Sequence, residues 1–183
     1  MVININNIIN KINNDNDFNQ IIYDIKNNDT VLKMKNFRQH YNTSCYDHCL
    51  FVSYYTYIIC KKLKLDYISA ARAAMLHDLF LYDWRFKNNR NGLHAFTHSK
   101  TALENAKKIF ELNKIEEDVI LNHMWPVTFY SLPKYKESYI ITLTDKFSAL
   151  LETIDGFKQT TTYCRILRYA YLLLGICAYR YFI

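Results

Sequence analysis

A histidine and an aspartate stand side by side in an otherwise largely apolar stretch, AAMLHDLFLYDW, at residues 73–84. Ionisable side chains are almost never fully buried unless they are paired or bound to another group. A fold that buries this stretch must therefore give His77 and Asp78 a partner. The two candidates are a hydrogen bond within the pair and a metal ion, since imidazole and carboxylate both bind first-row divalent cations.

Apolar residues recur at helical spacing along much of the chain, and no stretch alternates as a half-buried strand does. We expect Asp66 to cap a helix that runs to about Asp83 and places His77 on its core-facing side, with Asp78 about 100° around the axis. Further helices are expected over 47–63 with Asp47 as the cap, over 101–112, over 115–125 behind a capping box of Asn113 and Glu116, around 140–151, and over 161–181.

The chain has only three glycines and two prolines in 183 residues, fewer than sheets joined by tight turns usually need. We therefore predict an all-α helical bundle with short connections, folded as a single domain over residues 1–183. Within it we expect an N-terminal helical extension at 1–36, a core at 37–155 and a C-terminal apolar helix at 156–183.

Charge and cysteine content argue against several functions. The formal charge of +6 comes from scattered basic residues, so no nucleic-acid partner is expected. The five cysteines form no CxxC pair and are interpreted as reduced thiols. No signal peptide is recognisable, and Arg168 and Arg180 interrupt the apolar C-terminal segment, so we expect a cytoplasmic protein without a membrane span. That segment is suited to docking on the core or on a second copy, which is compatible with a homodimer.

The His-Asp pair is accompanied by other potential ligands on separate predicted helices. His48 lies near the start of one helix, His98 near the start of a later one, His123 near the end of another, and Asp145 in the middle of IITLTDKFSALLE. Helical bundles commonly build metal sites from one or two side chains on each of several helices. A metal ion is therefore favoured over an isolated His-Asp hydrogen bond.

The order His48, His77-Asp78, Asp145 resembles the H…HD…D signature of the HD-domain metal-dependent phosphohydrolases. The additional histidines resemble the six-ligand, two-metal branch, whose order is shared by the bacterial diadenosine tetraphosphate hydrolases of the HD type. The phrases TSCYDHCLFVSYY, RAAMLHDLFLYDW, HAFTHSKTALENA, ILNHMWP and TDKFSALLE are similar to a largely unassigned bacterial subgroup. The resemblance covers residues 37–152.

This resemblance implies two divalent ions (Fe, Mn, Co, Ni or Zn) held by His48, His77, Asp78, His98, His123 and Asp145. Asp78 would bridge the two ions, with His98 and His123 on the second one. Because His94 and His98 are four residues apart and could share a helical face, either could be the ligand. The family-like phrase favours His98 and leaves His94 either as a catalytic or phosphate-contacting candidate or as a solvated loop histidine.

Four further side chains are candidates through their positions. Asp83, five residues after Asp78, either orients a ligand or relays a proton, or is an exposed carboxylate at a helix end. Arg38 and His40 precede the first ligand helix and could contact a phosphate. Lys146 follows the last ligand and faces either the anion or solvent.

The resemblance implies a phosphohydrolase that cleaves a phosphate ester or anhydride of a small molecule, with a nucleotide as the leading candidate, by attack of a metal-bridging hydroxide. Two alternatives use the same ligands. One is a di-iron oxygenase of the same superfamily, and the other is a metal- or nucleotide-binding sensor without turnover.

Overall fold

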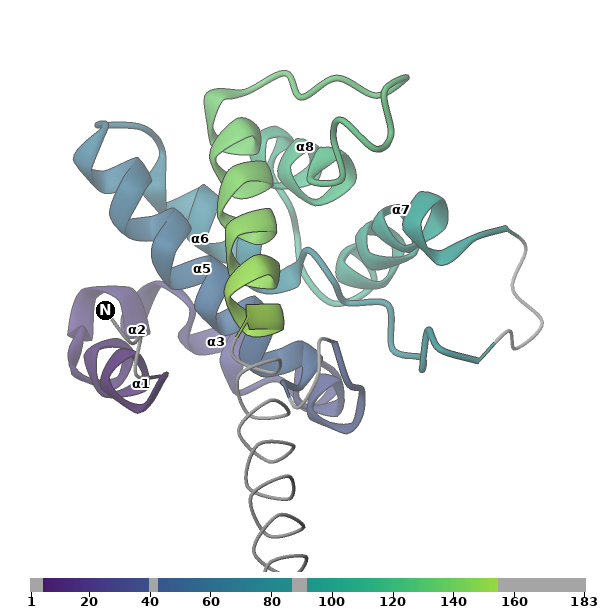
Figure 1. The fold of residues 1–183 in the computed structure, drawn as a ribbon. Coiled ribbons are helices and arrows are strands. Elements are labelled where there is room, and N and C mark those ends of the chain that lie inside the picture. Colours follow the sequence, from purple (N-terminus) through teal and green to yellow (C-terminus); the bar gives the residue numbers. More distant parts are fainter. Residues whose placement is uncertain (1–4, 40–42, 87–91, 155–183) are drawn as a thin grey trace, which may run out of the picture.

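The computed structural model describes residues 5–39, 43–86 and 92–154. This part of the chain is built of helices, and its only strand-like pairing is an isolated bridge between Arg38 and Ser44. The elements are α1 (Ile5–Asn14), α2 (Asn16–Ile21), α3 (Tyr23–Lys26), α4 (Asp29–Leu32), η1 (Lys33–Asn36), α5 (Cys45–Lys62), α6 (Tyr67–Leu76), α7 (His94–Lys107), α8 (Lys114–Asn122) and a last helix over residues 136–154 (Figure 1). The predicted all-α fold is confirmed.

The first long helix, α5, starts earlier than the sequence suggested. Its N-cap is Ser44, whose Oγ accepts a hydrogen bond from the backbone N–H of Asp47 at 3.1 Å. The same hydroxyl donates to Oδ2 of Asp47 at 2.6 Å. Asp47 is thus an acidic residue in the first turn and not the predicted cap. At this position its negative charge interacts favourably with the helix dipole.

The helix that carries the His-Asp pair is shorter than predicted. Asp66 caps α6 as expected, accepting a hydrogen bond from the backbone N–H of Ser69 at 3.0 Å. The helix ends at Leu76 and not at Asp83, which makes His77 its C-cap, and a turn follows. The prediction failed because apolar residues continue beyond the helix end and stay buried in the turn. As a result, the pair lies at the end of α6 and not along its side.

Three helices pack around the pair. In α5, Ser53 donates a hydrogen bond to the carbonyl oxygen of Ala71 in α6 at 2.7 Å. On another face of α5, the hydroxyls of Thr56 and Thr144 lie 2.7 Å apart, which joins α5 to the helix over 136–154. That helix, yellow-green in Figure 1, crosses in front of α5 and α6. Buried alanines line α6, and such small side chains let neighbouring helices approach closely; they are Ala70, Ala71, Ala73 and Ala74.

The capping box predicted at the start of α8 is confirmed. The side chain of Asn113 accepts from the backbone N–H of Glu116 at 2.9 Å, and Glu116 accepts from the backbone N–H of Asn113 at 2.8 Å. These reciprocal bonds satisfy two backbone groups that the helix itself leaves unpaired. They fix where α8 begins, and so help to determine the position of His123 at its other end.

The N-terminal helices are attached to the bundle through Arg72 on α6. Its guanidinium donates to both carboxylate oxygens of Asp24 at 2.7 and 3.0 Å, to the carbonyl oxygen of Ile21 at 3.2 Å and to Glu116 at 3.2 Å. Glu116 is buried, and Arg72 is the cation that pairs with it. Arg72 therefore joins α2 and α3 to the start of α8, and it points away from the His-Asp pair.

Arg72→Met is expected to destabilise the fold by about 2–3 kcal/mol, because it leaves the buried carboxylate of Glu116 without its cation. Urea unfolding followed by circular dichroism measures this change. Lys107→Met is the matched control, since it removes an exposed 2.8 Å ion pair with Glu117 and should cost under about 1 kcal/mol. Equal effects of the two substitutions would contradict the role given to Arg72.

The helix over 136–154 exposes an apolar stripe made up of Tyr139, Leu143, Phe147, Leu150 and Ile154. Such a stripe is compatible with the expected homodimer, which stays a prediction. The predicted C-terminal helix lies outside the described residues. Within the described ranges, no helix combines the length and apolar character needed to cross a membrane.

Candidate metal centre

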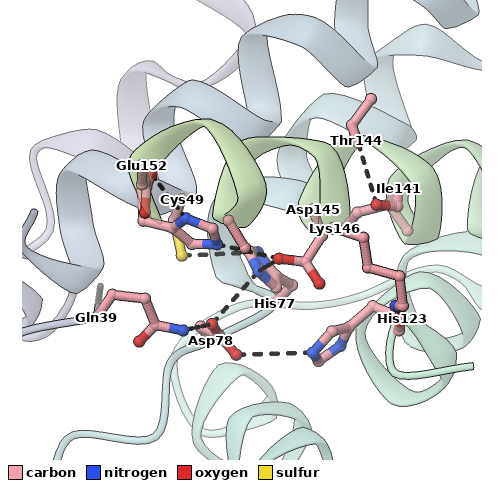
Figure 2. Close-up of polar contacts among 12 residues, drawn as sticks. Gln39, Cys49, His77, Asp78, His123, Ile141, Thr144, Asp145, Lys146 and Glu152 are labelled. Atoms are coloured by element: carbon pink, nitrogen blue, oxygen red, sulfur yellow. Dashed lines mark hydrogen bonds and ion pairs between the residues drawn. The ribbon is translucent and has the colours of Figure 1, made fainter. Parts of the chain in front are cut away.

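Six ionisable side chains from five elements meet in the middle of the bundle, and Figure 2 labels four of them: His77, Asp78, His123 and Asp145. α5 provides one in its first turn, the end of α6 provides two, α7 and the end of α8 provide one each, and the helix over 136–154 provides the last. In chain order these are His48, His77, Asp78, His98, His123 and Asp145. The structure thus brings together all six residues that the sequence nominated as ligands.

Backbone contacts orient three of the imidazoles alike. In His77, His98 and His123, Nδ1 lies 2.7, 2.7 and 2.8 Å from the backbone carbonyl oxygens of Ala74, His94 and Ile120. A carbonyl oxygen can only accept, so each Nδ1 carries the proton. Each Nε2 is then unprotonated in the neutral ring, and its lone pair is available to a metal ion.

The carboxylate of Asp78 lies between these rings. Its Oδ1 is 3.2 Å from Nε2 of His98 and 3.6 Å from Nε2 of His123. Its Oδ2 is 3.4 Å from Nε2 of His77. The two oxygens of Asp78 therefore face different ligands, which is the arrangement that a carboxylate bridging two ions requires.

A second cluster lies beside the first. Nε2 of His48 is 3.1 Å from Oδ1 of Asp145, and Nε2 of His77 is 3.8 Å from the same oxygen. Ligand atoms of His48, His77 and Asp145 lie within 4.8 Å of one another, as do those of His77, Asp78 and His123. Each group has the composition of a divalent metal site.

Two features show that these residues suit a metal ion. Nε2 of His77 and Oδ1 of Asp78 are buried, and neither makes a hydrogen bond of acceptable geometry within the described part of the chain. Nε2 of His98 and Nε2 of His123 lie 3.0 Å apart, and with both Nδ1 atoms protonated two lone pairs face each other. A cation bound by both nitrogens would remove this repulsion.

The carboxylates and histidines of the cluster shift one another's pKa values. Neighbouring anionic groups outweigh burial and raise the pKa of His48, His77 and His98, so these rings would release a proton when they bind a metal ion. Burial, reinforced by His77 and His98, lowers the pKa of His123 to about 3, so this ring is neutral near pH 7. Burial alone would raise the pKa of Asp78, but the neighbouring His77, His98 and His123 outweigh it and hold that pKa below its usual range. In the same way, the neighbouring rings of His48 and His77 outweigh burial and lower the pKa of Asp145. Both carboxylates are therefore ionised.

Two thiols also approach this centre. Cys45 and Cys49 lie within 4.8 Å of a carboxylate oxygen of Asp78. Burial raises the pKa of both thiols, and only a thiolate is a good metal ligand. They are therefore protonated near neutral pH, in line with the prediction of reduced thiols, and Cys45 donates a hydrogen bond to the carbonyl oxygen of Asp78 at 3.3 Å.

Glu152 is a contributor that the sequence reasoning missed. Its Oε1 lies 3.0 Å from Nδ1 of His48, on the side of the ring opposite Asp145. A carboxylate there holds the proton on Nδ1 and directs Nε2 toward the ligand cluster. A signal was available, since Glu152 follows Asp145 by seven residues and so occupies the same helical face two turns later.

Glu152→Gln is expected to weaken metal binding by about 10- to 100-fold, the range typical of residues that orient a ligand histidine. Competition with a fluorescent chelator measures the metal dissociation constant. The matched control is Glu104→Gln, an exposed position on α7, which should leave the constant unchanged. An unchanged constant in Glu152→Gln would show that Glu152 does not orient His48.

Beside the ligands lies a pocket of about 300 Å³, which Asp78, His98, His123 and Asp145 line. Lys146 lines it too; its Nζ donates to the carbonyl oxygen of His123 at 3.1 Å, and burial lowers its pKa. Trp84 and His94 form another part of the wall, with their rings stacked 5.7 Å apart. His94 also lies 3.0 Å from the hydroxyl of Tyr82 and stacks on His98.

Of the two histidines that the sequence left as alternatives, the structure places His98 beside Asp78. It places His94 on the pocket wall, where the side chain can reach a bound molecule. Lys146 is likewise on the wall and not directed to solvent. The structure therefore places both side chains beside the site, and the chemical roles proposed for them stay predictions.

Two other nominated residues, Asp83 and Arg38, lie apart from the pocket. Asp83 forms an ion pair with Arg85, with N–O distances of 2.9 and 2.5 Å, and this partner lowers the pKa of Asp83 to about 2. Arg38 is exposed, and its carbonyl oxygen accepts a hydrogen bond from Nε1 of Trp84. Neither side chain lines the pocket, so the geometry favours the exposed-carboxylate interpretation of Asp83. His40 lies outside the described residues.

Comparison with known protein families shows the family to which the chain belongs. A family model of the HD domain matches residues 45–150, more than half of the 183 residues. Searches of curated proteins and of solved structures found no match. The matched range runs from α5 through most of the helix over 136–154 and contains all six converging side chains. The chain therefore belongs to the HD domain family, whose members are mostly metal-dependent phosphohydrolases.

Proposed function

We propose that this protein is a metal-dependent phosphohydrolase that removes phosphate from a small organic molecule, with a nucleotide as the leading candidate. The observation that carries the proposal is that four of the six cluster residues, Asp78, His98, His123 and Asp145, line a pocket that Lys146 also lines. Divalent ions bound to this cluster would lower the pKa of water and neutralise the charge on phosphoryl oxygens.

The chain's own residues would position the reacting groups. The carbonyl contacts of His77, His98 and His123 keep their Nε2 atoms directed inward. Lys146 would hold a non-reacting phosphate oxygen as a point charge, which orients the phosphorus relative to Asp78. The small pocket and its partly buried walls limit the water that surrounds the phosphate.

The pocket also bears on the kind of substrate. Its volume of about 300 Å³ is at the lower end for small-molecule sites, which favours a compact ligand over a polymer. The aromatic wall of Trp84 and His94 offers surfaces of the kind on which nucleobases pack. These features support a mononucleotide or a phosphomonoester of similar size.

The direct test is a screen of nucleotides and phosphorylated metabolites with Mn, Co, Ni or Fe, in which released phosphate is measured. Metal-dependent release from at least one small compound is the expected result. No release with any metal, together with tight nucleotide binding, would instead indicate the sensor. About two irons per chain with substrate-dependent oxygen consumption would indicate the oxygenase.

Lys146→Met is expected to raise KM for the best substrate by about 10- to 100-fold, because it removes a hydrogen bond to a charged group. Steady-state kinetics of the metal-loaded protein measure this change. Lys136→Met is the matched control, because Lys136 is exposed on the same helix, and its KM should match that of the unchanged protein. A normal KM in Lys146→Met would remove Lys146 from the phosphate site.

A further inference from the structure

Gln39 lies next to the metal centre in a position that the family resemblance does not assign. It is 9 % exposed and precedes α5 in the segment that also contains Ser44. Its backbone N–H donates to the carbonyl oxygen of Thr43 at 2.9 Å, and its neighbour Arg38 pairs with Ser44 in the isolated bridge. These contacts fix the backbone from which the Gln39 side chain reaches the centre.

The amide of Gln39 has a defined orientation. Its Nε2 donates a hydrogen bond of 2.5 Å to Oδ2 of Asp78. The opposite orientation would bring the amide oxygen against an ionised carboxylate, and two acceptors repel each other. Figure 2 shows the second amide atom pointing away from Asp78. Thus Asp78 determines which atom of the amide remains available.

That remaining atom, Oε1, is buried and has no hydrogen-bond partner among the described residues, although Gln39 lines the pocket. A buried acceptor of this kind is normally satisfied by a donor in the native complex. An ionised phosphate oxygen cannot serve, because it is itself an acceptor. A substrate group that meets Oε1 from the pocket must therefore carry a hydrogen.

We propose that Gln39 recognises a hydroxyl group on the organic part of the substrate, close to the phosphate. This inference rests on the proposed phosphohydrolase function and narrows its substrate class to hydroxylated phosphomonoesters. Gln39 contacts the cluster at Asp78, whereas Lys146 contacts it at His123, and the two side chains lie at opposite ends of the cluster in Figure 2. The phosphate would be held toward Lys146 and the hydroxyl toward Gln39.

Two matched esters test the proposal in the metal-loaded protein: glycerol 1-phosphate carries a hydroxyl beside the phosphorylated carbon, and n-propyl phosphate does not. The unchanged protein should show at least about a 10-fold higher kcat/KM for the glycerol ester, because a site built around a hydroxyl leaves a polar group unpaired when it is missing. Gln39→Met should reduce this ratio to about 2 or less, mainly through KM of the glycerol ester. Gln20→Met, at an exposed glutamine on α2, should leave the ratio unchanged.

Metal content and binding provide readouts besides turnover. Gln39→Met should keep the metal content of the unchanged protein; a loss of metal would mean that Gln39 acts by supporting Asp78, and would overturn the proposal. Equal kcat/KM for the two esters in the unchanged protein would overturn it even if Gln39→Met does not fold. The proposal would also be overturned if Gln39→Met lowered kcat/KM by a similar factor for both esters.

The two proposals can fail separately. If neither ester nor any other phosphate compound is hydrolysed, the phosphohydrolase function fails. Binding of the matched phosphonates, 2,3-dihydroxypropylphosphonate and propylphosphonate, is then measured by calorimetry. A dihydroxypropyl analogue that binds at least about 10-fold more tightly supports hydroxyl recognition by Gln39, and equal affinities overturn it.

Discussion

Asp78→Ala is expected to abolish both metal retention and phosphate release. Asp78 is the one carboxylate whose two oxygens face different histidines of the cluster, with Oδ1 toward His98 and His123 and Oδ2 toward His77. Its removal takes one ligand from each proposed ion and leaves three inward-facing Nε2 atoms without the negative charge between them. Because metal ions contribute several kcal/mol to transition-state stabilisation, kcat/KM should fall by at least about 10³-fold.

Elemental analysis after dialysis and a phosphate-release assay measure the two effects. Circular dichroism should show the same helical content as in the unchanged protein, since Asp78 lies beyond the end of α6 at Leu76 and its substitution removes no helical residue. Asp29→Ala, at an exposed aspartate in the first turn of α4, is the matched control and should change neither property. Phosphate release that survives in Asp78→Ala would mean that the site is assigned to the wrong residues.

The second large effect is expected from His123→Gln. Nε2 of His123 lies 3.0 Å from Nε2 of His98 and 3.6 Å from Oδ1 of Asp78. The other group of potential ligands, His48, His77 and Asp145, does not include His123. The substitution should therefore lower the metal content from about two ions per chain to about one. The rate should fall by at least about 10²-fold, because one of two charges that stabilise the reacting phosphate is lost.

His94→Gln is the matched control for this experiment. The ring of His94 lines the pocket and lies 3.0 Å from the Tyr82 hydroxyl, whereas His98 occupies the place next to Asp78. We expect His94→Gln to keep about two ions per chain. If His94→Gln loses an ion while His123→Gln keeps both, the second ion is held by a different set of side chains.

The sequence predicted the architecture well because its local signals are strong. Asp66 at the start of α6 and the reciprocal pair of Asn113 and Glu116 are local caps, and both occur in the structure. The start of α5 was misplaced because Ser44 and Asp47 are both good capping residues three positions apart. The end of α6 was misplaced because the apolar residues Leu79 and Phe80 are buried in the turn after the helix and not in a continuation of it.

The centre itself was only partly predictable. Its six nominated ligands follow the order of a known signature, and the structure brings all of them together. Gln39 was missed because its contact with Asp78 spans 39 positions, and nothing in the local sequence indicates it. Glu152 contacts His48 across 104 positions, yet its spacing from Asp145 could have revealed it. Asp83 was placed too near the site because the predicted helix was extended beyond its true end.

The measurement that tests the central claim most directly is a crystal structure of the protein purified without added metal, with ions identified by anomalous scattering. We predict two anomalous peaks on either side of the Asp78 carboxylate. One peak should be bonded to His48, His77, Asp78 and Asp145, and the other to Asp78, His98 and His123. If the histidines and Asp78 contact only one another and Gln39, without an ion even after Mn or Fe is supplied, the cluster is not a metal centre and the proposed function fails with it.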